Sequence, residues 1–316
     1  MEYIKGFTFG WGANRGDFLK KEAKESLKLL KERTASEYVI IALAAEQDTA
    51  FSTEVKYRGD HMVSDEELID MIEYAKNLGL KVMIKPTVNP SDGTWRAHIN
   101  FFDIDVPCEP KWHQWFESYT NYQLHYAEIA ARMNCEMLII GCEMVQTERR
   151  EREWRALINS VRAVYKGLIT YNTDKYQEGN VKWWDAVDVI SSSGYYPIGD
   201  WNNQLNRIEL IVKSFDKPFF FAEAGCPSRT GSANIPNDWS LQGDVNLKEQ
   251  QLYYKEMFEE TKKRDWVCGF GLWDWQTLLY PEVNASKNRD YAVFGKPSEK
   301  IIKGFYQSIS KKHSIK

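Results

Sequence analysis

The chain is predicted to fold as one (β/α)8 barrel, an α/β TIM barrel that spans residues 1–316 as a single domain. Three observations favour this architecture. Strand-like and helix-like patterns alternate along the whole sequence. The expected strands are continuous apolar runs, which is typical of parallel strands covered on both faces. The length of 316 residues, 43% of them hydrophobic, is in the range of one large α/β barrel.

The first half of the chain contains four strand–helix units. The expected strands are residues 3–9, 38–45, 81–87 and 136–141. The expected helices are residues 18–33, 64–78, 110–133 and 149–165. The second helix has the clearest boundaries, because Ser64 and Glu67 form a capping box at its start and Gly79 stops it.

The second half repeats the pattern. The expected strands are residues 167–172, 187–192, 218–222 and 267–273. The expected helical segments are residues 183–186, 203–215, 247–263 and 298–308. A doubly wound sheet is the alternative, but it would need more glycine after the first strand. The long connections 46–64, 88–109 and 224–246 follow strands, where the loops of a barrel surround its active site.

Composition excludes several classes of partner. A net charge of -4 argues against nucleic acid or an anionic membrane as the main partner. No apolar run reaches the length of a membrane span. The first residues show no signal peptide, so a cytoplasmic monomer is expected, or a secreted one if a leader has been removed. Five cysteines without a Cys-x-x-Cys motif suggest neither a disulfide framework nor a zinc knuckle.

Two glutamates stand out at the ends of the expected fourth and seventh strands. Glu143 and Glu223 each follow a short apolar run. A buried carboxylate is costly unless it is hydrogen-bonded or paired. Two of them, in a chain with 14% aromatic residues, fit the hydrolysis of a glycosidic bond. The alternative is that each glutamate caps the next helix or pairs with a nearby Lys or Arg.

The other strand ends narrow the chemistry. No His-x-His follows the first strand and no histidine ends a strand, which argues against a metal-dependent hydrolase, so no metal site is predicted. The last strand ends in Trp273 and Trp275 where a phosphate-binding barrel would have a glycine-rich loop. A phosphorylated substrate is therefore not expected, and no cofactor is implied.

The order of these features resembles the large retaining (β/α)8 clan of glycoside hydrolases. More narrowly, the chain resembles the bacterial β-1,4-mannanases of glycoside hydrolase family 113. The motifs that carry the resemblance are KGFTFGW (5–11), KPTV (85–88) with DGTWR (92–96), IGCEM (140–144), FAEAG (221–225) and GLWDW (271–275). The resemblance implies double-displacement hydrolysis of β-mannan or mannooligosaccharides through a covalent glycosyl-enzyme.

The resemblance also implies roles for individual residues. Glu223 would be the nucleophile, and Glu143 would protonate the leaving oxygen and then activate water. Tyr196 would hydrogen-bond Glu223, with Tyr195 in its place if the strand phase differs. The substrate-binding set would be Trp11 and Trp95 as stacking platforms, Trp273 as the floor of the reacting subsite, Lys85 and Asn89 as partners of sugar hydroxyls, and Asn172, Tyr195 and Trp275.

One position departs from the clan pattern. Many members have Asn before the acid/base residue, where it binds the sugar 2-hydroxyl, but this chain has Cys142. Another group must then hold that hydroxyl. Three alternatives stay open: a β-glucanase or β-glucosidase-like enzyme of the same clan, an aldolase-like barrel with Lys85 as a Schiff-base lysine, and a sugar-binding barrel without catalysis. Endo or exo action is also open.

Overall fold

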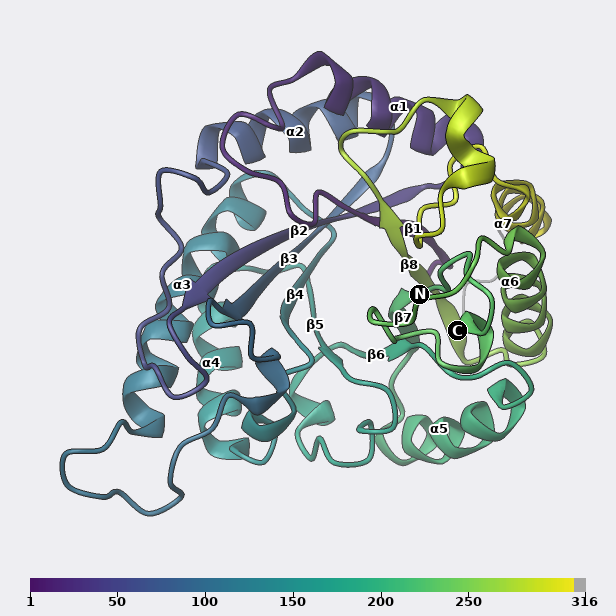
Figure 1. Cartoon of the computed structure of the whole chain (residues 1–316). Coiled ribbons are helices and arrows are strands. Elements are labelled where there is room, and N and C mark those ends of the chain that lie inside the picture. The colour runs from purple at the N-terminus through teal and green to yellow at the C-terminus, as the bar shows by residue number, and fades with distance from the viewer. Residues whose placement is uncertain (310–316) are drawn as a thin grey trace.

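Eight parallel strands close into one barrel in the computed structural model of the protein, which describes residues 1–309 (Figure 1). Each strand pairs with the next one along the chain, and β8 pairs with β1. The closed order excludes a doubly wound sheet. The strands are β1 (Ile4–Phe9), β2 (Tyr38–Gln47), β3 (Lys81–Pro90), β4 (Met137–Cys142), β5 (Leu168–Thr173), β6 (Val189–Gly194), β7 (Phe219–Ala224) and β8 (Val267–Trp275).

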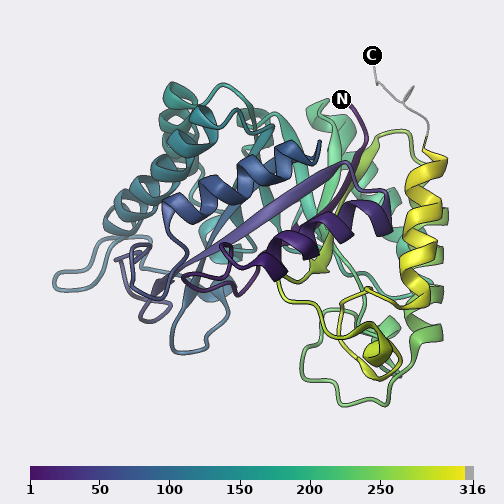
Figure 2. The same cartoon turned by 90° about the horizontal axis from the view of Figure 1, so that it is seen from above.

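The α-helices form a ring outside the strands (Figures 1 and 2). They are α1 (Lys21–Thr34), α2 (Asp65–Asn77), α3 (Trp112–Arg132), α4 (Glu151–Val164), α5 (Trp201–Phe215), α6 (Leu247–Thr261) and α7 (Pro297–Ser308). Between β5 and β6 the described chain has only a 3-10 turn, Trp184–Ala186, where a short helical stretch was expected. Ser64 caps α2, because its side chain accepts a hydrogen bond from the Glu67 backbone. The other half of the predicted capping box is replaced, since the Glu67 carboxylate accepts from the Gly16 N–H at 2.7 Å.

The predicted strands are confirmed, and β2, β3 and β8 each continue two or three residues beyond the expected end. β2 and β3 stay in register over ten residue pairs, from Tyr38 opposite Lys81 to Gln47 opposite Pro90. This pair therefore continues beyond the rim of the barrel, and Asn89 lies within the extension. The long loops after the strands project to the side away from the N-terminus (Figure 2).

The barrel interior changes character along its axis. At the N-terminal ends of the strands, the interior is a packed apolar core. Its residues include Ile40, Met83, Ile139 and Phe220. At the C-terminal ends of the strands, the interior holds an aromatic cluster of Tyr195, Trp273 and Tyr291, and Trp11 packs against this cluster. The larger apolar cluster lies between the strands and the helices. The interior is therefore apolar at the N-terminal ends of the strands. Polar side chains begin in the middle layer, where Thr170 bonds Ser191, and the aromatic cluster lies at the C-terminal ends.

Among residues 1–309, no helix combines the length and the apolar character needed to cross a lipid bilayer.

Candidate active site

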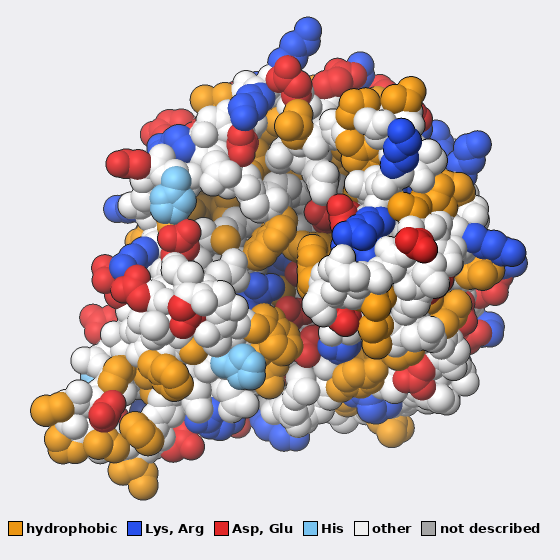
Figure 3. Space-filling model, viewed as in Figure 1, with side chains coloured by type: hydrophobic (Ala, Val, Ile, Leu, Met, Phe, Trp, Pro, Cys, Tyr) orange, Lys and Arg blue, Asp and Glu red, His pale blue; other side chains and the backbone are white. Residues whose placement is uncertain are grey.

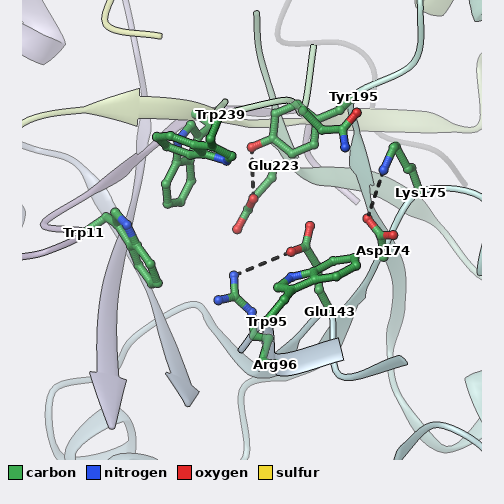
Figure 4. A pocket seen from close by; sticks show the side chains of 11 residues that line it. Trp11, Trp95, Arg96, Glu143, Asp174, Lys175, Tyr195, Glu223 and Trp239 are labelled. Carbon is green, nitrogen blue, oxygen red and sulfur yellow. Dashed lines mark hydrogen bonds and ion pairs between the residues drawn. The ribbon is translucent and has the colours of Figure 1, made fainter. Parts of the chain in front are cut away.

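A cavity of about 480 Å³ opens at the C-terminal ends of the strands. Figure 3 shows the hollow on this face of the molecule, and Figure 4 shows the side chains that line it. Glu143 and Glu223 face each other across it, with tryptophans on the walls. The lining residues are Trp11, Trp95, Arg96, Glu143, Asp174, Lys175, Tyr195, Glu223, Asn237, Trp239 and Trp273.

Glu143 follows β4 in a left-handed backbone conformation, with a φ of 52°. Such a conformation is uncommon for a residue with a side chain and has to be held by its surroundings. Its own N–H donates to the Asn172 carbonyl at 2.8 Å, and the N–H of Met144 donates to the Tyr171 hydroxyl at 3.0 Å. These bonds to β5 fix the turn that aims Glu143 into the cavity.

The Glu143 carboxyl group has two neighbours of different strength. Ser193 Oγ donates to Oε1 at 2.6 Å. Arg96 Nη2 lies 3.5 Å from Oε2, which makes an ion pair without a short hydrogen bond. Asn172 supports Ser193, because its Nδ2 donates to Ser193 Oγ at 2.9 Å. Glu143 thus has a hydroxyl at one oxygen and a more distant cation at the other.

The Glu223 carboxyl group is held more tightly. Lys85 Nζ donates to Oε1 at 2.5 Å, and Cys142 Sγ donates to the same oxygen at 3.3 Å. The Tyr195 hydroxyl donates to Oε2 at 3.0 Å. Lys85 is fully buried, so its charge is balanced by the Glu223 carboxylate and is not in contact with solvent. Three donors on the two oxygens favour the ionised carboxylate.

The two glutamates are close enough to act on one bond. An oxygen of Glu143 and an oxygen of Glu223 lie within 4.8 Å of each other. Retaining glycosidases place their carboxyl groups about 5–5.5 Å apart, and inverting enzymes leave about 6.5–9.5 Å for a water. The spacing fits the retaining geometry.

The surroundings move the two pKa values apart. Burial raises the pKa of Glu143 above its usual range, and the negative charge of Glu223 raises it further. Burial acts on Glu223 in the same direction, but the charges of Lys85 and Arg96 outweigh it and lower the Glu223 pKa. A proton shared by the pair is therefore favoured on Glu143 and the negative charge on Glu223, which is the division that an acid and a nucleophile require.

The expectation for Tyr196 is wrong, and Tyr195 takes its place. Side chains alternate along β6: Ser193 faces the barrel interior, and Ser192 faces outward to Glu178 in the connection between β5 and β6. Tyr195 continues the inward set. Tyr196 continues the outward set and donates its hydroxyl to Glu178.

Four of the expected substrate-binding side chains do not line the cavity among the described residues. Lys85 pairs with Glu223, which also leaves it unsuited to the Schiff-base alternative. Asn89 accepts a hydrogen bond from Arg96 Nη1 at 2.7 Å, and Asn172 bonds to Ser193. Trp275 is a core residue that donates from Nε1 to Ser26 of α1. The β1–β8 register shifts between Phe7 and Phe9, and the extra residue in β8 turns Trp275 to the face opposite Trp273. Trp11, Trp95, Tyr195 and Trp273 do line the cavity.

The cavity also holds residues that the sequence did not single out as site residues. Arg96 follows Trp95 in the DGTWR motif, and Asp174 and Lys175 come directly after β5. Asn237 and Trp239 belong to the long connection after β7. Loop length pointed to that connection, but no local pattern identified these positions. Burial and the charge of Glu143 raise the pKa of Asp174 to about 7.

Comparisons with known proteins place this geometry in context. The family model described as Glycoside Hydrolase Family 113 matches residues 7–296. The search of curated proteins found no match. A solved "GH113 beta-1,4-mannanase" is similar to the chain at 68% identity with a TM-score of 0.97, covering 98% of this chain and 100% of the other.

Two further structures mark the range of the similarity. A GH113 β-mannanase from Alicyclobacillus acidocaldarius, solved in complex with ManMIm, is 40% identical with a TM-score of 0.95, over 98% of this chain and 99% of the other. A β-D-glucuronidase from Dictyoglomus thermophilum is 16% identical with a TM-score of 0.67. The alignment covers 98% of this chain but 51% of the glucuronidase, so this likeness concerns the fold alone.

Proposed function

The chain belongs to glycoside hydrolase family 113, and from this premise we propose that it cleaves β-1,4-mannosidic bonds with retention, using Glu223 as nucleophile and Glu143 as acid and base. The observation that carries the proposal is the pair of buried glutamates within 4.8 Å, one with a raised and one with a lowered pKa. The similarity to two family-113 β-mannanases, at 68% and 40% identity, supports the mannoside as substrate.

The first step forms the glycosyl-enzyme. A carboxylate oxygen of Glu223 attacks the anomeric carbon, and the bond from that carbon to the leaving oxygen breaks. The proton of Glu143 passes to the leaving oxygen, so Glu143 becomes an anion while Glu223 becomes a neutral ester. Lys85 and Tyr195 orient the attacking carboxylate before the reaction.

The second step returns the enzyme to its first state. Glu143 takes a proton from a water, whose oxygen attacks the anomeric carbon from the face that the leaving group occupied. The ester bond to Glu223 breaks, and Glu223 is again a carboxylate. Two inversions at one carbon retain the β-configuration in the product.

The tryptophans supply the apolar surfaces for the sugar rings. Trp273 packs edge-on against Trp11 with ring centroids 5.4 Å apart, and Trp239 is 60% exposed above it. Trp95, 44% exposed, lies on another wall. Rings of this kind bury the C–H faces of a sugar. Hydroxyl groups of the substrate find partners in Asp174, Lys175 and Asn237 around the same cavity. We propose that the protein acts as a monomer.

The test is a side-by-side digestion of manno-, gluco- and xylo-oligosaccharides of equal length, with products sized over time. We expect cleavage of the manno-series, internal cuts in the longer chains, and no turnover by a Glu223→Gln control. A faster digestion of the gluco-series would overturn the substrate assignment and favour the β-glucanase alternative. Cleavage by the control variant would place the catalytic residues elsewhere.

A further inference from the structure

We propose that Arg96 is a positioning residue that stabilises Glu143 as a carboxylate, and that it therefore speeds hydrolysis of the glycosyl-enzyme more than its formation. The inference rests on the proposed function, because it concerns the second step of that reaction.

Arg96 is fixed between the Glu143 carboxyl group and the cavity wall. It begins a 3-10 turn (Arg96–His98) in the connection after β3, and its residue surface is 9% exposed. Nη2 lies 3.5 Å from Glu143 Oε2 and 3.8 Å from Cys142 Sγ. Nη1 donates to Asn89 Oδ1 at 2.7 Å, and the guanidinium lies 5.5 Å from the Trp11 ring centroid. Contacts on both sides leave the guanidinium little freedom to move away from Glu143.

The charges in the site change partners during the reaction. In the free enzyme the anion is Glu223, and Lys85 lies 2.5 Å from it. In the glycosyl-enzyme Glu223 is an ester, and Glu143 has given its proton to the leaving group. The buried anion of the site is then Glu143. A buried carboxylate without a partner is strongly disfavoured, and Arg96 is the cation already beside it.

The other groups around Glu143 do not replace Arg96. Ser193 offers a neutral hydroxyl, and Lys85 is held at Glu223 on the other side of the pair. Lys175 pairs with Asp174 at 3.7 Å. The titratable and charged groups that face Glu143 from the surrounding elements are Lys85, Arg96, Cys142, Asp174, Tyr195 and Glu223.

The test compares Arg96→Met, which removes the charge, with Arg96→Lys, which keeps it. The substrate is a dinitrophenyl β-mannobioside, whose good leaving group makes hydrolysis of the intermediate the slow step. We expect Arg96→Met to lower kcat by about 100-fold, in the range of a lost acid–base contribution, and kcat/KM by about tenfold or less. Arg96→Lys should lie between this variant and the wild type. A larger rapid burst of dinitrophenol should accompany the lower kcat.

The pH profile separates this role from simple support of the fold. Loss of the cation disfavours the carboxylate, so the Glu143 pKa rises and the acid limb of kcat moves to higher pH. Azide is an anionic nucleophile that needs no base, so it should restore the turnover of Arg96→Met. Asn89→Ala, which leaves Arg96 in place without its anchor, should shift the acid limb in the same direction by a smaller amount.

Equal losses in kcat and kcat/KM, with an unmoved acid limb and no rescue by azide, would overturn the proposal. An Asn89→Ala enzyme with the wild-type profile would also count against it, and this variant keeps the test open if Arg96→Met does not fold. A wild-type enzyme that cleaves no mannoside would instead refute the proposed function.

Discussion

The ends of β4 and β7 carry the same residue in almost the same burial, yet their surroundings differ. Glu143 is 7% exposed and Glu223 is 4% exposed. At β7 the carboxylate receives three donors, including a lysine at 2.5 Å. At β4 the carboxyl group has a serine hydroxyl and an arginine at 3.5 Å.

The comparison shows that burial alone does not decide the charge of a carboxyl group. Burial raises both pKa values, and only the cations beside Glu223 reverse the direction there. The close approach of the two glutamates then acts further on Glu143, because two neighbouring anions repel each other. The difference between the proposed nucleophile and the proposed acid follows from the groups around Glu223, with Lys85 first among them, rather than from the glutamates themselves.

Loss of the β7 carboxylate should have the largest effect. Glu223→Ala removes the proposed nucleophile, so turnover should fall by about 10⁵-fold or more for every glycoside, including those with good leaving groups. Initial rates on mannotetraose and on an aryl β-mannobioside measure this. Residual activity above that level on the aryl substrate would contradict the role of Glu223.

Loss of the β4 carboxyl group should be selective. Glu143→Ala should lower turnover of mannooligosaccharides by about 10²–10⁴-fold, the usual contribution of a general acid. The first step should be nearly normal on a substrate with a good leaving group, since little protonation is needed there. Added azide should then release a β-mannosyl azide, detected by NMR. If Glu223→Ala behaves in this way instead, the two roles are exchanged.

Removal of Lys85 should raise the pKa of Glu223 at the end of β7, as burial already raises the pKa of Glu143 at the end of β4. In Lys85→Met, burial is no longer opposed by the nearest cation, so the Glu223 pKa should rise. Activity needs the carboxylate, and its pKa is lowered in the native enzyme, so the acid limb of kcat/KM should move to higher pH. We expect a loss of about 100-fold at neutral pH. An unmoved acid limb would mean that Tyr195 and Arg96 are enough to keep Glu223 ionised without Lys85.

The pair Trp273 and Trp275 separates substrate binding from folding on β8. Trp273→Ala should cost about 2–3 kcal/mol in kcat/KM, because the indole covers a sugar face, with a smaller change in Tm. Trp275→Ala should lower the free energy of unfolding by about 3–5 kcal/mol, as a buried core indole does. Kinetics and thermal unfolding of both variants give the comparison. A reversed pattern would make Trp273 the core residue.

The pH profile of the wild-type enzyme reports on Glu143 and Glu223 together and needs no mutation. Glu223 must be ionised and Glu143 protonated, so kcat/KM should fall on the acid side as Glu223 takes up a proton and on the basic side as Glu143 loses one. The expected curve is bell-shaped. A flat profile from about pH 4 to 9 would contradict the assignment.

The sequence was sufficient for the strands and for the two glutamates. Buried parallel strands are continuous apolar runs, and a charged residue that interrupts such a run at its end is visible without a structure. Glu143 and Glu223 could be found in this way because their local sequence and their position in the repeat agree. The C-terminal extensions of β2 and β3 were not predicted, since the last residues of these strands are polar or small.

The partners of the glutamates could not be predicted as well. The side-chain phase at the end of β6 decides between Tyr195 and Tyr196. Serine occupies both inward and outward positions just before them, at 191, 192 and 193, so the sequence does not define this phase. Lys85 was identified as a site residue, but it was expected to bind the substrate rather than Glu223. Only the closed barrel brings the side chains of β3 and β7 together. Arg96 and Trp239 reach the site from long loops, whose path depends on the whole fold.

The most direct test of the division between β4 and β7 is to trap the glycosyl-enzyme and find the residue that carries the sugar. A mannosyl fluoride with fluorine at its second carbon slows both steps, and the good leaving group lets the intermediate accumulate. Mass spectrometry of the digested protein should place one sugar on the peptide that contains Glu223, and none on the peptide that contains Glu143. A label on Glu143, or turnover with no labelled intermediate, would contradict the account.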